Sequence, residues 1–427
     1  MQLNLKGRRP FLMIAAPIGL IAALLAIALV LRSRDARIVD RMVQAHDFPG
    51  AIQFLEHHYD FHRHSGQREL RRFALAVLRQ GLTEHDDFER CFAATGLAVY
   101  GDWSGMPAIN AALSSNKDML QRAAIEGLAD ARNARALNLL STLYRHGKPL
   151  ERVMVTEALA NSSDHRALPI LLEATRSEDP EVRTWSVLGI GRTGDPRVLR
   201  YLRNLQGSEQ DTQVNTALAH SELRLGDRSL GNFAILETVL FTGDSSAASA
   251  AALALGDAKD QSAMTQLREA LGNRQLDLRV RLAAAVALTR YGDRDGLRLV
   301  NDIVGEPYER GYLPPLFNDL NLSVGRGVLL SAMSSKDIVL QLAAIEAMGR
   351  LGSAAEIGVL TQALERAHDP YLVAQIAWSL GRIGDPRAIA PLLGLAGNKD
   401  APVRDTAADA LARIASARLN GSALGLF

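Results

Sequence analysis

The chain has 427 residues, of which 48% are hydrophobic and only 5% aromatic. Its single cysteine, Cys91, excludes an intramolecular disulfide framework and a zinc site built from cysteines. Residues 1–37 hold six of the 48 Lys and Arg residues but one of the 47 Asp and Glu residues. The rest of the chain is therefore weakly acidic, and nucleic acid is not expected as a partner.

The N-terminus predicts a membrane anchor. A basic tail, residues 1–10, precedes the uncharged run "FLMIAAPIGLIAALLAIALVL", residues 11–31, and basic residues follow it. At 1.5 Å per residue this run spans about 30 Å as a helix, the thickness of a hydrocarbon core. A cleavable signal peptide is the alternative, but its apolar region is shorter. We expect a single-pass protein of a bacterial inner membrane, with the rest of the chain on the periplasmic side.

Residues 32–85 are expected to form a helical capping region between membrane and repeats. They contain "EHHYDFHRH", with four histidines between His57 and His64. On one helix His58 and His62 would share a face, a spacing that can bind a transition metal. The favoured interpretation is an exposed polar stretch, so no metal and no cofactor are expected.

A repeat of about 32 residues follows. An acidic residue followed three places later by an aliphatic one recurs at steps of 32, 33, 33, 60, 32 and 31, and the step of 60 corresponds to two units. The positions are Asp179, Asp211, Asp244, Asp277, Asp337, Asp369 and Asp400, with Asp118 and Asp86 before them. A second column of Gly-Asp pairs accompanies them at Gly101, Gly194, Gly226, Gly256, Gly292 and Gly384.

Each unit predicts two antiparallel helices. The first-column aspartate caps the start of one helix, as expected at Asp179, Asp211, Asp277, Asp369 and Asp400. The second-column glycine ends that helix, and the aspartate after it opens the next one. Because one such unit cannot close its own core, neighbours must stack. The predicted fold is all-α: a solenoid of about ten to eleven helix pairs over residues 86–416, before a tail of residues 417–427.

The stretches "DPEVRTWSVLGIGRTGDPRVLRYLRNL" and "DPYLVAQIAWSLGRIGDPRAIAPLLGLAG" resemble HEAT repeats of the short type also found in phycobilisome lyase subunits. The resemblance implies that the second helices line a concave face that holds proteins. It also implies that Arg183, Arg281 and Arg404 belong to a ladder linking adjacent units. The pattern is broken at Lys148 and near residue 307.

The irregular part of the solenoid, residues 305–335, begins with "GEPYERGYLPPLFNDLNLS". Its prolines preclude a long helix, and it concentrates aromatic residues in an aromatic-poor chain. We therefore consider Tyr308, Tyr312 and Phe317 as candidate contacts for a partner. The alternative is a degenerate repeat whose aromatic side chains pack inward.

Catalytic motifs are not found in the sequence, and an enzyme is not expected. Gly189, Gly191 and Gly194 match a dinucleotide fingerprint but are attributed to helix termination. Trp185 and Trp378 are expected in the core. The predicted function is a membrane-anchored scaffold for protein–protein interaction, such as the assembly of a membrane-associated complex. The alternatives are a bilin lyase-like chromophore-handling subunit and a metal-sensing membrane protein.

Overall fold

The computed structural model describes residues 34–306 and 308–423. Within these ranges the chain forms α-helices and short 3₁₀ helices, without a β-strand. The predicted all-helical solenoid is thereby confirmed.

The helices follow one another as pairs. A helix over residues 34–44 precedes α2 (Phe48–His58) and α3 (His64–Gly81). The next pairs are α4 (Asp87–Val99) and α5 (Met106–Leu113), α6 (Asp118–Ala131) and α7 (Ala134–His146), α8 (Pro149–Ser162) and α9 (Leu168–Ala174), α10 (Pro180–Thr193) and α11 (Leu199–Gln206), and α12 (Thr212–Arg224) and α13 (Leu230–Thr242). They continue as α14 (Ser245–Ala258) and α15 (Gln261–Gly272), α16 (Leu278–Thr289) and α17 (Leu297–Gly305), α18 (Pro314–Phe317) and α19 (Leu322–Met333), α20 (Ile338–Leu351) and α21 (Ile357–Arg366), α22 (Pro370–Ile383) and α23 (Ile389–Ala396), before α24 (Ala401–Ala423).

The first-column aspartates stand at helix starts. The side chain of Asp179 accepts a hydrogen bond from the backbone N–H of Glu181 at 2.9 Å, which satisfies a donor that the first helical turn leaves free. Asp211, Asp277 and Asp369 make the same bond two residues ahead. Asp400 directly precedes α24.

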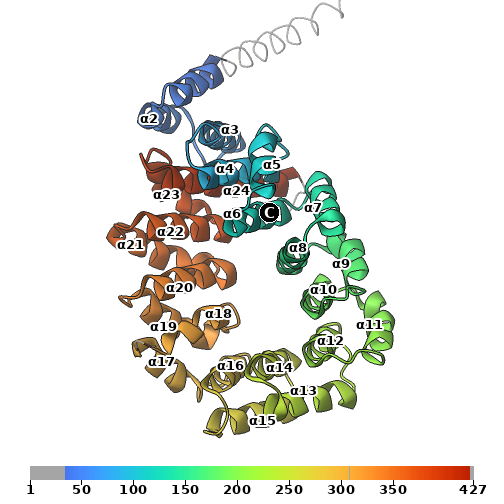
Figure 1. Cartoon of the computed structure of the whole chain (residues 1–427). Helices are drawn as coiled ribbons and strands as arrows, with labels where there is room; N and C mark the ends of the chain where they lie inside the picture. The colour runs from blue at the N-terminus through green and yellow to red at the C-terminus, as the bar shows by residue number, and fades with distance from the viewer. Residues whose placement is uncertain (1–33, 307, 424–427) are drawn as a thin grey trace, which may run out of the picture.

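From α4 to α24 the even-numbered helices form an inner row and the odd-numbered ones an outer row, whereas in the first pair α3 packs along inner helix α24 and α2 beside outer helix α23 (Figure 1). The inner helices begin at the first-column aspartates, so they are the first helix of each unit as counted from the sequence. The expectation that second helices line the inner side is therefore corrected. An inner helix contacts the inner helices before and after it and also its outer partner. This is why α16 is buried almost all round.

The second-column glycines end the inner helices as predicted, with the exception of Gly256. Gly194 and Gly384 end α10 and α22 with φ of 72° and 75°, the left-handed region that favours glycine. Gly256, by contrast, lies inside α14, which continues to Ala258 and ends at Lys259 with φ 51°. Because α14 has 14 residues, as α10 and α22 do, Gly256 comes before its end and Asp257 lies on the helix.

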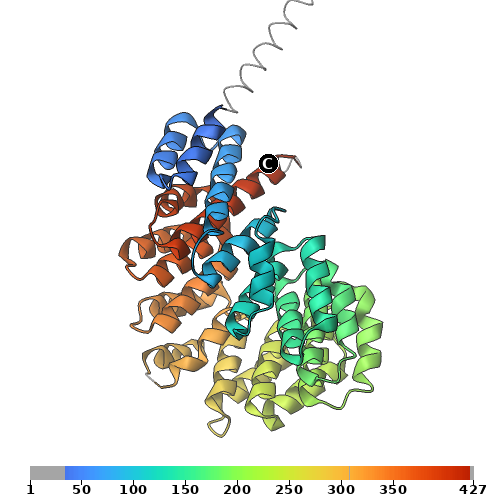
Figure 2. The same ribbon diagram turned by 45° about the horizontal axis from the view of Figure 1, so that its top comes forward.

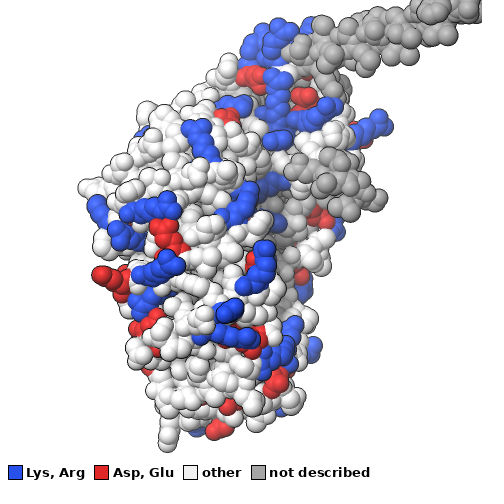
Figure 3. Space-filling view, turned by 90° about the vertical axis from the view of Figure 1, so that its right-hand side faces the viewer, with Lys and Arg blue, Asp and Glu red and all other residues white. Residues whose placement is uncertain are grey.

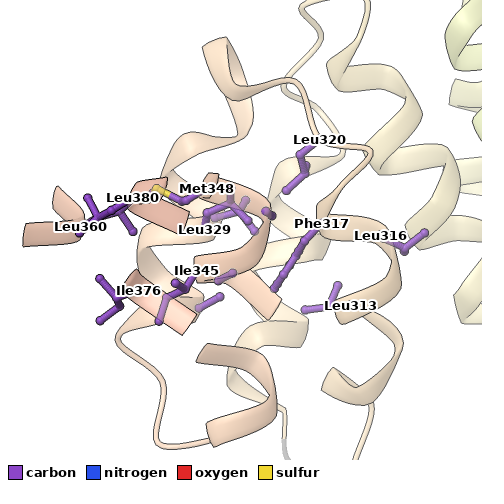
Figure 4. Packing of buried hydrophobic residues seen from close by; sticks show 14 of the residues in the cluster. Leu313, Leu316, Phe317, Leu320, Leu329, Ile345, Met348, Leu360, Ile376 and Leu380 are labelled. Atoms are coloured by element: carbon purple, nitrogen blue, oxygen red, sulfur yellow. The ribbon is translucent and has the colours of Figure 1, made fainter. Parts of the chain in front are cut away.

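The irregular unit is a shortened one. In place of a full inner helix it has α18, only four residues long, between α16 and α20. Phe317 and Leu313 are fully buried there, and Figure 4 shows Phe317 pointing into the cluster that contains Leu329 and Ile345. Hydrophobic burial thus holds the two neighbouring units together where the long inner helix is missing.

The solenoid closes on itself. Its last helix, α24, packs along α3 and also contacts α4, so the red end of the chain lies against its blue beginning in Figures 1 and 2. The array is therefore a ring, in which the last inner helix meets the first ones.

The outer surface carries charges of both signs. On the side that includes α7, α9 and α11, basic side chains predominate, with acidic ones among them (Figure 3). Pairs such as Arg145–Glu173, at 2.7 Å, and Arg203–Asp227, at 2.6 Å, link successive outer helices or turns.

The membrane prediction requires a correction. The basic tail and residues 11–31 lie outside the described residues. Among residues 34–306 and 308–423, no helix combines the length and apolar character needed to cross a bilayer. Helix α24, with 23 residues, is long enough but carries charged side chains such as Arg404 and Asp409. The predicted single-pass membrane localisation is therefore not borne out.

Candidate functional site

A cleft of about 970 Å³ lies where the ring closes. One wall comes from α4, α6 and α8, and the other from α20, α22 and α24. The two walls are far apart in the sequence and face each other only because the ring closes.

The cleft is rich in carboxyl groups. Two of them form ion pairs with the guanidinium groups that line it: Arg350 with Glu346 at 2.7 Å and Arg413 with Asp409 at 2.6 Å. Seven acidic residues line the cleft in total: Asp86, Glu89, Glu126, Asp130, Glu346, Asp405 and Asp409. Its interior therefore favours a cationic group.

Burial and the neighbouring acids raise the pKa of two of these carboxyl groups. Burial, with a contribution from neighbouring Glu84 and Asp86, raises the pKa of Glu89. Burial also raises the pKa of Glu126, and the charges on Glu157 and Asp130 act in the same direction. Both side chains would be stabilised as carboxylates by a positive charge placed in the cleft.

Trp378 lies in the wall of the cleft instead of the core that the sequence predicts. It is half-buried, and the guanidinium carbons of Arg350 and Arg382 lie 5.5 and 5.4 Å from its ring centroid. Arg382 also lies 3.9 Å from Asp130 on the opposite wall. Cation–π contacts hold the indole ring between the two arginines.

We call the place where the last helix meets the first ones the seam. The ladder of arginine–carboxylate pairs that links neighbouring repeats continues across it. Within the array, Arg183 of α10 pairs with Glu209 at 2.9 Å, two residues before the aspartate that caps α12. Across the seam, Arg404 of α24 pairs with Glu84 at 2.7 Å, two residues before Asp86, which caps α4. Arg404 therefore pairs with a carboxylate of the first unit in the same way that Arg183 pairs with a carboxylate of the unit after it. Arg281 instead donates to the carbonyl of Leu271.

Asp405 is enclosed at this seam. Its side chain is 1% exposed, and Oδ1 accepts a hydrogen bond from Arg404 at 3.0 Å, whereas Oδ2 has no hydrogen-bond partner among the described residues. A Cβ on Gly81 of α3 would lie 2.3 Å from that Oδ2. Burial, against the opposing effect of Arg404, raises the pKa of Asp405 to about 7.

A second polar cluster surrounds Asp257. Its carboxylate accepts hydrogen bonds from His220 and Arg224, both at 2.8 Å, and contacts Arg290, which also binds Asp319. Burial acts to raise the pKa of Asp257, but the bond from His220 and the charge of Arg290 hold it well below its usual range. The cluster ties α12, α14 and α16 to the shortened unit.

The structure separates the predicted aromatic contacts. Tyr308 is 95% exposed, whereas Phe317 is fully buried in the core. Tyr312 is half-buried, with the guanidinium carbon of Arg279 at 4.6 Å from its ring centroid. Only Tyr308 thus presents its ring fully to solvent.

The histidine cluster does not lie on one helix. Helix α2 ends at His58, whose Nδ1 lies 2.8 Å from the carbonyl of Phe54, and α3 begins at His64. His62 falls in the turn between them, so the assumed helical spacing to His58 does not exist. The described part of the chain contains no group of three His, Cys, Asp or Glu side chains suited to a metal ion.

Sequence reasoning missed the cleft and the Asp257 cluster. Each acidic residue of the cleft occupies an ordinary position on its own helix, and only ring closure brings the two sets together. The sequence pattern predicts a turn at Asp257 because it follows a second-column glycine. The spacing is the signal that would have corrected this: Gly256 follows Asp244 by only 12 positions, whereas Gly194 and Gly384 follow Asp179 and Asp369 by 15. Lys259 and Asp260, which caps α15, occupy the usual positions of the glycine and aspartate.

The ring of stacked helix pairs defines a protein of the α-solenoid class. A family model described as HEAT repeats matches residues 139–221 and 327–417, so these two stretches are similar to HEAT repeats. None of the curated proteins compared with the sequence matches it.

Solved structures show more distant likenesses. The complex of CpcE and CpcF of phycocyanin lyase from Nostoc sp. PCC7120 is 20% identical, covers 54% of this chain and 92% of that chain, and has a TM-score of 0.37. An engineered protein is 17% identical over 80% of this chain and 98% of its own, with a TM-score of 0.28. Human deoxyhypusine hydroxylase in complex with glycerol is 17% identical over 75% and 96%, with a TM-score of 0.30. These values are too low to assign an activity.

Proposed function

We propose that the protein is a scaffold that holds a segment of a protein partner in the cleft. The observation that carries this proposal is the cleft itself, formed by the first and last units and held at the seam by the Arg404–Glu84 pair. A volume of about 970 Å³ accommodates several side chains of a bound segment.

The lining supports binding instead of catalysis. Its guanidinium groups are engaged in ion pairs, as in Arg350–Glu346 and Arg413–Asp409, which fixes side chains on the wall formed by α20, α22 and α24. Such a surface provides shape and charge for recognition, and no reacting group is required.

The proposal is tested by filling the cleft. Ala123 of α6 lines it and is half-buried, so Ala123→Trp places a large ring inside. Thr142→Trp, on the exposed side of outer helix α7, is the matched control. Partners are captured from native cell extracts by a photoactivatable cross-linker at Phe92, another lining residue.

We expect a protein that is captured with the unmodified chain and with Thr142→Trp but is lost with Ala123→Trp. Capture that is equal for Ala123→Trp contradicts the proposal, provided that circular dichroism shows both variants folded. Failure to capture any protein contradicts it as well.

Tyr308 is a second candidate contact. Arg310, two residues on, forms a 2.7 Å ion pair with Asp337, which caps α20 in the wall of the cleft. The segment that bears the exposed ring is thus tied to the start of α20, whose later residues Glu346 and Arg350 line the cleft, and it could extend the bound surface. Tyr308→Ser in the same capture experiment should weaken recovery of the partner, whereas Phe317→Ser would act through loss of the core.

The bilin lyase-like alternative rests on the type of repeat alone, and pigment attachment on co-expression would support it. The metal-sensing alternative predicts stoichiometric zinc binding that is lost in His58→Ala/His62→Ala.

A further inference from the structure

One position recurs in every inner helix except the four-residue α18 and differs systematically around the ring. It is the second residue of the helix, directly after the capping turn. In α10, α12, α14 and α16 this residue is polar and exposed: Glu181, Gln213, Ser246 and Arg279. In α4, α6, α8, α20, α22 and α24 it is apolar: Phe88, Met119, Leu150, Val339, Tyr371 and Pro402.

The six helices with the apolar residue are the same six that line the cleft. Successive inner helices run parallel, because an antiparallel outer helix separates each from the next. Their first turns therefore lie along one edge of the ring. We call the five exposed members, Phe88, Met119, Leu150, Val339 and Tyr371, the apolar rim.

The fold does not require these side chains to be apolar. Phe88 is 41% exposed, Met119 70% and Tyr371 71%. The four polar residues at the equivalent position show that the repeat folds without an apolar group there. Exposed apolar side chains gathered around one cleft, instead of being scattered, are typical of an interaction surface.

The charge of the cleft indicates which side chains the partner carries. Seven carboxyl groups line it, and five of them form an ion pair with an arginine at 3.9 Å or less: Glu346, Asp409, Asp130, Asp405 and Glu126. Asp86 and Glu89, both at the start of α4, form no ion pair among the described residues and remain for a bound cation to neutralise. The burial that raises the pKa of Glu89 and Glu126 adds to the benefit of a bound cation.

We propose that the apolar rim and the acidic cleft together form a docking surface for a protein segment that carries Lys or Arg side chains among large apolar ones. The apolar side chains lie on the rim, and the cationic ones reach the carboxylates inside. The inference rests on the proposed scaffold function and names the chemistry of its partner.

The test uses the full chain and random peptides displayed on phage. We expect the selected peptides to be enriched in both Lys or Arg and large apolar residues. Their affinity, measured with synthetic copies by fluorescence anisotropy, should fall at least about tenfold in Phe88→Ser/Tyr371→Ser, as for the loss of a central apolar anchor. Glu181→Ser/Gln213→Ser, changed at the equivalent position across the ring, should bind within about twofold of the unmodified chain.

Several outcomes would overturn the inference: peptides without basic residues, peptides that bind the rim variant as tightly as the unmodified chain, or no selected peptides. The rim residues are exposed, so thermal denaturation should show both double variants as stable as the unmodified chain. If Ala123→Trp abolishes partner capture while the rim variant does not, the scaffold proposal stands and this inference fails. If neither variant affects capture, both fail.

Discussion

Arg404 of α24 donates a hydrogen bond to Glu84 at 2.7 Å, although 320 positions of sequence separate the two residues. The same guanidinium binds Asp405 and lies 5.2 Å from the ring centroid of Phe48. One side chain thus joins the last helix of the array to its beginning.

Removal of Arg404 should open the ring. Arg404→Met leaves the carboxyl groups of Asp405 and Glu84 without their cation in a buried setting, which typically costs about 3–5 kcal/mol. We expect a lower denaturation midpoint and a larger radius of gyration in small-angle X-ray scattering. Arg197→Met is the control, because the Arg197 side chain is 88% exposed and its pair with Asp195 is solvated, so the denaturation midpoint should stay unchanged. Unchanged scattering and stability in Arg404→Met would show that the pair does not hold the seam.

The buried carboxyl of Asp405 should make stability depend on pH. Its pKa is about 7 in the folded chain against 3.8 for an ordinary aspartate, so the folded state holds a proton that the unfolded state releases. The resulting stabilisation is complete below about pH 3.8 and is lost as the pH rises to about 7. Between about pH 5 and about pH 8 the loss amounts to about 2–3 kcal/mol.

Asp405→Asn should remove this component, because the amide does not titrate. The charged groups around the site are Arg404, Glu84 and Glu89, and they remain in the variant. Chemical denaturation at the two pH values measures the difference. A variant that loses as much stability on going to the higher pH as the unmodified chain would rule out Asp405 as the titrating group.

Loss of Asp257 should destabilise the far side of the ring. In Asp257→Asn the positive charges of Arg290 and Arg224 lose their shared carboxylate, and we expect a loss of about 3 kcal/mol or more in the free energy of unfolding. Asp195→Asn is the control: asparagine still caps a helix, and Arg197 is exposed, so the stability should stay close to that of the unmodified chain. Equal losses of unfolding free energy in both variants would show that Asp257 contributes no more to stability than an exposed aspartate.

Two glycines of "GIGRTG" should respond differently to alanine. Gly194 has φ of 72°, so Gly194→Ala meets backbone strain of about 1–2 kcal/mol. Gly191 lies inside α10, where an added Cβ would be 2.6 Å from the Cβ of Ser221 on α12. Its role is close helix packing, which corrects the prediction that all three glycines terminate a helix.

A double-mutant cycle separates these causes. Ser221→Gly should relieve part of the cost of Gly191→Ala, with a coupling energy of about 1 kcal/mol, and should be additive with Gly194→Ala. Thermal denaturation of the single and double variants measures both couplings. If the effects of Gly191→Ala and Ser221→Gly on stability are additive, the added Cβ is accommodated because α10 and α12 move apart.

The irregular unit shows where sequence reasoning was incomplete. The prolines at 314 and 315 correctly indicate that no long helix forms there, and two interpretations of the aromatic residues were left open. The structure places Phe317 in the core and Tyr308 in solvent, so each interpretation describes one residue. Spacing along a short irregular segment does not determine which side chain points inward, because the neighbouring helices decide it.

The sequence by itself determined the repeated unit, because capping aspartates and terminating glycines act within one helical turn of their own position. It also placed Arg404 in the column of residues that link neighbouring units. It did not determine that the neighbour of the last unit is the first one, since closure depends on small angles accumulated over every helix pair. Ring closure, the cleft and the grouping of apolar first-turn residues around it were decided by the tertiary structure alone.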